Sequence, residues 1–165
     1  MRDSDFERLY EDHAQALFGF LAYRTGDRAL AEDVMSEAFE RALKARKRYD
    51  PGKASAKTWL YSIALNCLTD HQRRQGAEMR ALDRVGAPAG ETLVDPGIER
   101  AESRDEIQRA LDRLSEEERE VVALRYGGEL TAKEAAKVLG EKETTVEGRL
   151  YRALRKMKEE LEGDR

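Results

Sequence analysis

A row of cationic side chains near the end of the chain has the clearest chemical potential. Five cations against Glu147 give residues 147–158 a net charge of +4. The row comprises Arg149, Arg152, Arg155, Lys156 and Lys158. Guanidinium and ammonium groups that recur along a helix can neutralise nucleic-acid phosphates and fix the register of binding. The competing interpretation is an ordinary amphipathic helix with a solvated cationic face.

The segment that carries this row, residues 131–158, has the pattern of a helix-turn-helix. Ala136 is small where two helices cross closely, and Gly140 supplies the tight turn between them. The second helix presents an apolar stripe to the core, made of Val146, Leu150, Leu154, Met157 and Leu161. Because a second helix of this kind lies in the major groove of DNA, the segment predicts nucleic-acid binding.

A second concentration of positive charge lies upstream, around a polar loop at residues 49–57. Trp59 and Tyr61 follow the loop at the start of a predicted helix. Cations interleaved with aromatic rings suit single-stranded or opened DNA, because unstacked bases need a surface on which to lie. Core packing of Trp59 and a solvated helix end at residues 44–48 are the alternative interpretations. The basic members are Arg41, Lys44, Arg46, Lys47, Arg48, Lys53, Lys57, Arg73 and Arg74.

The net charge of the whole chain conceals these local concentrations. It is −4 overall, yet residues 1–40 carry −6 and residues 41–75 carry +7. Residues 76–103 and 104–165 carry −3 and −2. Local charge decides which partner a surface attracts, so a chain with this overall balance can still bind DNA.

Catalytic and metal-binding arrangements are not expected. His13 and His71 lie on different predicted helices, and Asp70 beside His71 is too little for a triad or a metal site. Cys67, the single cysteine, excludes an intramolecular disulfide and is interpreted as a small buried apolar residue. We find no signal peptide and no long apolar run. We therefore predict no enzyme activity, no metal or cofactor, no membrane insertion, and a soluble cytoplasmic protein.

The elements that position these groups are predicted to form an all-α fold of two small helical domains joined by a flexible linker. Gly26 ends the first helix, and Asp27 caps the second. Ser55 caps the third helix, and Gly76 ends it. Glycines and prolines with little periodicity mark the linker. The predicted boundaries are residues 1–76, 77–102 and 103–165.

Two capping boxes organise the C-terminal domain, which contains the helix-turn-helix. Ser115 with Glu118 begins one helix, which two consecutive glycines end. Thr131 with Glu134 begins the first helix of the helix-turn-helix.

Taken in this order, four segments resemble the bacterial extracytoplasmic-function (ECF) RNA polymerase sigma factors. A helix-turn-helix alone is common, whereas four segments in family order and spacing are specific. The resemblance implies that residues 1–76 are sigma region 2 and residues 103–165 sigma region 4. The segments are FERLYEDHAQALFGFLAYRTGD, AEDVMSEAFERAL, KTWLYSIALNCLTDHQRR and LSEEEREVVALRYGGELTAKEAAKVLGEKETTVEGRLYRALRKMKEEL.

The resemblance also implies partners and site residues. A polymerase face would bind the core enzyme through Glu32, Asp33, Ser36, Glu37, Phe39 and Glu40. Minus-10 residues would recognise and open that promoter element: Lys53, Ala54, Ser55, Lys57, Thr58, Trp59, Tyr61, Asn66, Asp70, Arg73 and Arg74. Minus-35 residues would read the second element: Lys142, Glu143, Thr144, Thr145, Glu147, Gly148, Arg149, Arg152 and Arg155. The family often uses an anti-sigma factor, which is a further candidate partner.

Two acidic side chains depart from the family pattern. Members often carry TVKSR where this chain has TVEGR, residues 145–149, and Glu143 replaces part of a commonly apolar turn. Glutamates near DNA repel phosphates, yet they can accept a hydrogen bond from the cytosine amino group and so specify bases. These glutamates keep a sigma-like adaptor without initiation activity as one alternative. A free-standing helix-turn-helix regulator is the other alternative, against which the acidic helix at residues 28–46 and the basic loop region argue. The promoter sequence and the arrangement of the two domains stay open.

Overall fold

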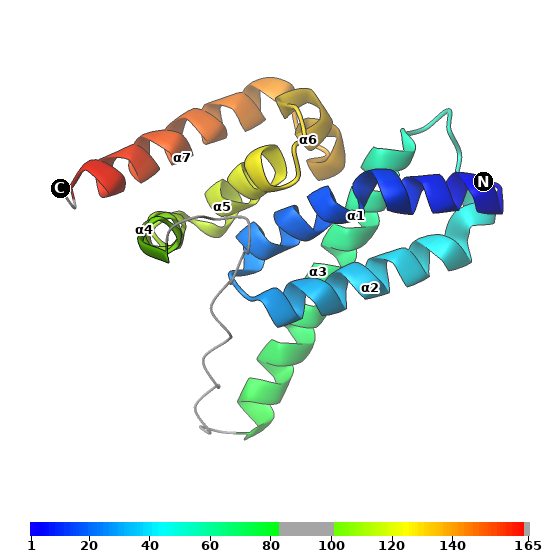
Figure 1. The fold of residues 1–165 in the computed structure, drawn as a ribbon, viewed down its shortest axis with the longest axis horizontal. Helices are drawn as coiled ribbons and strands as arrows, with labels where there is room; N and C mark the ends of the chain where they lie inside the picture. Colours follow the sequence, from blue (N-terminus) through cyan, green and yellow to red (C-terminus); the bar gives the residue numbers. More distant parts are fainter. Residues whose placement is uncertain (83–100, 164–165) are drawn as a thin grey trace.

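The chain folds entirely into helices in the part that the structure describes (Figure 1). This computed structural model describes residues 1–82 and 101–163, and the side chains of residues 1–78 and 105–163. The predicted all-α fold class is confirmed. The elements are α1 (Asp3–Thr25), α2 (Arg28–Ala45), η1 (Arg46–Arg48), α3 (Ala56–Leu82), α4 (Ala101–Asp112), α5 (Glu116–Val122), the π-turn η2 (Ala123–Gly127), α6 (Ala132–Leu139) and α7 (Glu143–Gly163).

Local capping explains where most of these helices begin. The Asp27 carboxylate accepts a hydrogen bond from the Leu30 amide at 3.2 Å and starts α2. Ser55 Oγ accepts one from the Thr58 amide at 3.1 Å at the start of α3. Both predicted capping boxes are present, at the starts of α5 and α6. These caps supply acceptors for amides that have no partner inside the helix, and the corresponding predictions are confirmed.

Glycine ends α1 and α6 as predicted, but it does not end α3. Gly26 and Gly140 adopt left-handed backbone conformations, with φ of 67° and 68°, and end α1 and α6. The prediction that Gly76 ends the third helix is wrong, because α3 continues to Leu82. One glycine inside a helix costs about 1 kcal/mol relative to alanine, and the good helix formers that follow Gly76 sustain the helix. Most of the predicted linker, residues 83–100, lies outside the described residues.

The two halves of the molecule share one apolar core. The N-terminal half (α1–α3) and the C-terminal half (α4–α7) contact each other where α1 meets η2 and where α3 meets α6. Figure 1 shows α5 and α6 on one side of α1 and α2 on the other. Fully buried side chains from both halves form a single cluster, which includes Phe20, Tyr61, Leu124 and Leu130. The two halves therefore form one packed body.

The buried stripe of α7 differs from the predicted one at one position. Val146, Leu150 and Ala153 are buried, whereas Leu154 is 38% exposed. With 3.6 residues per turn, position 153 returns to the face of 146 and 150 more closely than position 154 does. The assignment of Leu154 to the core is therefore wrong, since alanine takes that place.

Candidate polymerase and promoter interfaces

The acidic side chains of α2 form an exposed row on the N-terminal half. Glu32, Asp33, Ser36 and Glu40 are all exposed, as expected of residues that meet a protein partner. Their helix is held by the opposite, apolar face, which includes the fully buried Ala31, Val34, Ala38 and Ala42.

Phe39 belongs to this predicted face but lies in the core. Its exposure is 7%, and its ring packs against Tyr10 and Phe6, with centroid distances of 4.8 and 6.3 Å. The structure therefore places Phe39 behind the exposed row, where it supports the helix.

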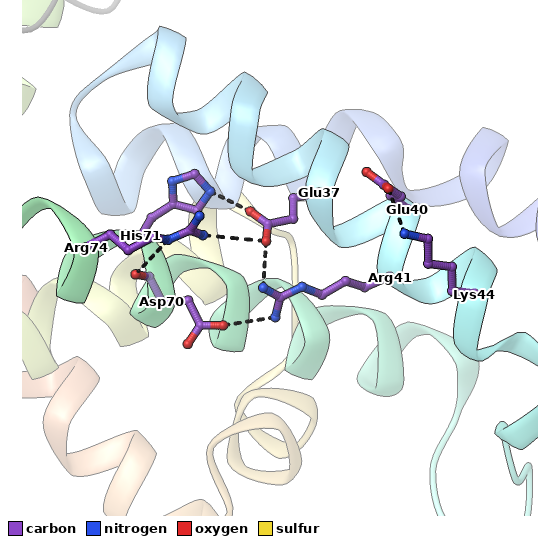
Figure 2. Close-up of polar contacts among 7 residues, drawn as sticks. All are labelled: Glu37, Glu40, Arg41, Lys44, Asp70, His71 and Arg74. Atoms are coloured by element: carbon purple, nitrogen blue, oxygen red, sulfur yellow. Dashed lines mark hydrogen bonds and ion pairs between the residues drawn. The ribbon is translucent and has the colours of Figure 1, made fainter.

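Glu37, another member of the predicted polymerase face, is the centre of a charged network between α2 and α3 (Figure 2). Its carboxylate lies 2.6 Å from both Arg41 Nη2 and His71 Nε2. Arg41 also donates to Asp70 at 3.0 Å, and Arg74 lies 3.6 Å from Glu37. Figure 2 shows these side chains converging from the two helices. The network joins the helix of the polymerase face to the helix of the minus-10 residues.

The electrostatics of the network favour an ionised Glu37. Burial alone would raise the pKa of Glu37, but the hydrogen bonds from His71 and Arg41 outweigh it and hold the pKa below its ordinary value. An ionised carboxylate can only accept, so the His71 Nε2–H is the donor. Sequence reasoning missed this role of His71, which is 34 positions from Glu37. The Glu37–Arg41 ion pair could have been predicted from the sequence, because residues four apart are neighbours on a helix.

The minus-10 residues divide by exposure. Lys53, Ser55, Asn66, Arg73 and Arg74 are exposed. Ala54, Lys57, Trp59 and Asp70 are half-buried. The rings of Trp59 and Tyr49 are tilted by 48°, with their centroids 4.9 Å apart. The Tyr49 hydroxyl donates to the Ala54 carbonyl at 2.8 Å, so the indole helps to hold the loop. The packing role of Trp59 is thus present, and its side chain is half-buried.

Two minus-10 residues are covered by the C-terminal half or by their own helix. Thr58 and Tyr61 are buried, at 7% and 0% exposure. The Tyr61 hydroxyl donates to the Gly128 carbonyl at 3.0 Å, and burial raises the pKa of Tyr61. Lys57 pairs with Glu134 of α6 at 3.3 Å. In this arrangement the centre of the minus-10 surface faces protein, and the assignment of Tyr61 to DNA stays a prediction.

The minus-35 residues are far more open. Lys142, Glu143, Thr144, Thr145, Glu147, Arg152 and Arg155 are exposed, and Gly148 and Arg149 are half-buried. Arg149 donates to Glu141 at 2.7 Å, so its guanidinium is already oriented by the turn that precedes α7. Lys156, farther along, donates to Glu118 of α5 at 2.8 Å. The structure thus brings these residues together along one segment, from Lys142 just before α7 to Arg155 within it.

Comparisons with known proteins bear on both halves. The models of Sigma-70 region 2 and of Sigma-70, region 4 match residues 9–78 and 104–157. The chain is 32% identical over 152 residues to the ECF RNA polymerase sigma factor SigL of Mycobacterium tuberculosis, covering 91% of this chain and 85% of SigL. This chain belongs to the ECF RNA polymerase sigma factor family. As an ECF sigma factor, it directs RNA polymerase to promoters and is not an enzyme.

Further relatives of this sigma factor support the assignment. It is 30% identical over 161 residues to the ECF RNA polymerase sigma factor BldN of Streptomyces coelicolor, covering 96% of this chain but 61% of BldN. The sigma factor RpoE of Bartonella quintana, solved in complex with the anti-sigma factor NepR, matches with a TM-score of 0.81 at 25% identity. That match covers 98% of this chain and 99% of RpoE, so both halves are similarly placed in the two structures.

Among the described residues, no cluster of three or more histidine, cysteine or acidic side chains could hold a metal ion. In the same part of the chain, no helix is long and apolar enough to span a bilayer. Cys67 is buried, as predicted, and burial raises the pKa of its thiol to about 11.

Proposed function

We propose that the two halves of this sigma factor divide promoter recognition as the family resemblance implies. The N-terminal half would bind core polymerase through α2 and open the minus-10 element through the loop and α3. The C-terminal half would read the minus-35 element through α7. The single observation that supports this division most strongly is the exposed acidic row of α2, which lies apart from the cationic minus-35 helix.

The polymerase face would consist of the exposed Glu32, Asp33, Ser36 and Glu40. Glu37 would contribute by positioning α2 against α3, because its carboxylate is bound by His71 and Arg41 of the network. The network keeps α2 and α3 in fixed register, so polymerase bound on α2 would hold the minus-10 residues at a defined place on the promoter.

Opening the minus-10 element would require a surface that captures bases. Unstacking a base costs a few kcal/mol, and stacking on an aromatic ring returns about 1–3 kcal/mol per base. Trp59 and Tyr61 supply the rings, and exposed cations such as Lys53 and Arg73 would hold the backbone.

Reading of the minus-35 element would depend on the first turns of α7. Arg152 and Arg155 are exposed and suit phosphates. Glu143 and Glu147 are also exposed, and we propose that they accept hydrogen bonds from cytosine amino groups.

An anti-sigma factor and a cytoplasmic location complete the proposal. The similar RpoE structure is a complex with an anti-sigma factor, and we propose that a protein of that class holds this sigma factor inactive. RNA polymerase acts on DNA in the cytoplasm of a bacterium, which is where the protein would work.

Run-off transcription with purified core polymerase on genomic fragments tests the proposal. We expect promoter-specific transcripts with the wild-type protein. Asp33→Arg should abolish co-purification with core polymerase and leave the helical content unchanged, because the side chain is exposed. Glu7→Arg, at an exposed acidic position on α1 outside the polymerase face, is the matched control and should co-purify normally. Unchanged co-purification of Asp33→Arg would remove the polymerase face from α2.

The same assay distinguishes an active sigma factor from a sigma-like adaptor. The adaptor is the second candidate because Glu143 and Glu147 depart from the family pattern. An adaptor would bind core polymerase without producing any promoter-specific transcript. A free-standing helix-turn-helix regulator would have no use for the Sigma-70 region 2 that matches residues 9–78.

A further inference from the structure

The cationic row of α7 divides into two groups by what its members bind. Arg149 and Lys156 donate hydrogen bonds of 2.7 and 2.8 Å to carboxylates outside α7. Arg155 and Lys158 instead approach glutamates one turn farther along α7, at 3.6 and 3.9 Å, and their side chains are 71% and 74% exposed. Arg152 is also exposed. Two cations of the row are therefore held by other elements, and three project from the surface.

Glu141 links the two helices of the helix-turn-helix. Its amide donates to the Ala136 carbonyl of α6 at 3.0 Å, so its backbone belongs to the end of that helix. Its carboxylate accepts a hydrogen bond from Arg149, which lies in the second turn of α7 and has a side chain that is 15% exposed. Because Glu141 is bound to both helices, it restricts the angle between them.

The residue before α7 cannot cap the helix with its side chain. Lys142 stands there, and its carbonyl accepts from the amides of Thr145 and Val146 at 3.1 and 3.2 Å. A capping side chain must accept a hydrogen bond from a helix amide, whereas an ammonium group has three donors and no acceptor. The helices α5 and α6, by contrast, begin with capping boxes. The pair between Glu141 and Arg149 therefore provides a link between turn and helix that Lys142 cannot provide.

Lys156 joins the later part of α7 to the start of α5. Its ammonium donates to Glu118, whose side chain is 8% exposed. Burial alone would raise the pKa of Glu118, but the hydrogen bonds from Lys156 and Ser115 outweigh it and hold the pKa below its ordinary value. A buried ionised carboxylate needs a partner of opposite charge. Since positions 149 and 156 are about two turns apart, both attachments lie on one side of α7.

We propose that Arg149 and Lys156 are positioning residues, which set the orientation of α7 in the major groove without contacting DNA themselves. The phosphate contacts then belong to Arg152, Arg155 and Lys158. This inference deepens the proposed minus-35 function and rests on it. It removes Arg149 from the residues that read the promoter and adds Glu141 and Glu118, which hold the reading helix in place.

Glu141→Ala has opposite consequences for the two possible roles of Arg149. If Arg149 bound DNA, the substitution would free its guanidinium and remove a negative charge near the phosphates, so binding would tighten. Because Arg149 positions α7, we expect binding to weaken several-fold. Glu117→Ala removes the same charge from an exposed site on α5 and is the matched control, with unchanged binding expected.

The measurement uses holoenzyme reconstituted from the full chain and purified core polymerase. Its probe is a fluorescent promoter fragment that the wild-type holoenzyme transcribes in the run-off assay. The double variant of Glu141→Ala and Arg149→Met should bind no more weakly than Arg149→Met alone, because both substitutions break the same link. Tighter binding by Glu141→Ala, or losses that simply add in the double variant, would overturn the positioning role of Arg149.

The salt dependence of binding distinguishes positioning from phosphate contact. Each phosphate contact contributes about 0.9 to the slope of log affinity against log salt concentration on double-stranded DNA. Arg152→Met should therefore reduce this slope by about 1. Arg149→Met and Lys156→Met should weaken binding and leave the slope unchanged. A reduced slope for either of these two variants would show that its cation meets DNA, against the proposal.

Two further readings keep the outcomes distinct. Circular dichroism checks that the variants keep the helical content of the wild-type protein, and Glu141→Gln, which retains an acceptor oxygen, decides if Glu141→Ala does not. An absence of promoter-specific transcripts with the wild-type holoenzyme would overturn the promoter function and this inference with it. Specific transcripts together with tighter binding by Glu141→Ala would overturn the inference alone.

Discussion

The two surfaces proposed to read DNA differ in how the folded chain presents them. The minus-35 residues extend from Lys142, just before α7, to Arg155 within it, and seven of the nine are exposed. The centre of the minus-10 surface lies under the other half of the molecule, where Tyr61 is fully buried. The same chain thus displays one reading surface and covers the other.

The difference follows from what each surface would bind. Phosphates and base edges are polar, so a helix that reads them can be charged and remain in water at no cost. Unstacked bases need apolar rings, and an apolar surface in water lowers its free energy by being covered. Leu124 and Leu130 of the C-terminal half are fully buried in the same apolar cluster as Tyr61.

The largest expected difference between the two halves is the loss of stability when a tyrosine on each half is replaced by alanine. Tyr61→Ala should lower the free energy of unfolding by ~3–5 kcal/mol, the range for buried aromatic residues replaced by alanine. Tyr151, on α7, is 69% exposed, so Tyr151→Ala should change the free energy of unfolding by less than about 0.5 kcal/mol. Urea denaturation followed by circular dichroism measures both. Equal effects of the two substitutions would mean that Tyr61 is not covered in solution.

A smaller effect, with opposite signs in the two halves, should appear in the pH dependence of stability. The pKa of Glu37 is lowered in the folded state, so its contribution is present above its ordinary pKa of 4.5 and is lost as pH falls through the lowered value. Burial raises the pKa of Glu120, although Arg24 offsets part of this. The contribution of Glu120 is therefore present at low pH and lost as pH rises through its raised value.

Glutamine variants measure these two contributions. The advantage of the wild-type protein over Glu37→Gln should shrink as urea denaturation is repeated at falling pH. The difference between the wild-type protein and Glu120→Gln should move in the opposite direction. Parallel trends would show that the ion pair between the halves, rather than burial, dominates Glu120.

The smallest effect on stability, and the sharpest on specificity, should come from the exposed surface. Glu147 is exposed at the start of α7, so Glu147→Lys should change the free energy of unfolding by less than about 0.5 kcal/mol. It should nevertheless change the preferred minus-35 sequence, because lysine cannot accept a hydrogen bond from cytosine. Selection from a promoter library measures this preference. An identical preference would remove Glu147 from the reading surface.

Local chemistry let the sequence predict much of the fold. Gly26, Asp27 and the two capping boxes act on residues within one helical turn, so their effects can be read from neighbours in the chain. The apolar stripes likewise predicted most of the core. The prediction at Gly76 was wrong because the preference of one glycine to end a helix is weaker than the helix propensity of the residues around it.

Contacts between distant residues could not be predicted in the same way. Glu37 and His71 are 34 positions apart, and Tyr61 and Gly128 are 67 positions apart. No local rule links such residues, because the packing of whole helices brings them together.

Side-chain type and short-range spacing were enough to predict most helix boundaries, the family and the chemistry of each reading surface. The tertiary structure alone decided which of those surfaces meets water. The approach of Gly19 to Gly127 needs two backbones, each of unremarkable conformation, and their closeness exists once the halves have packed.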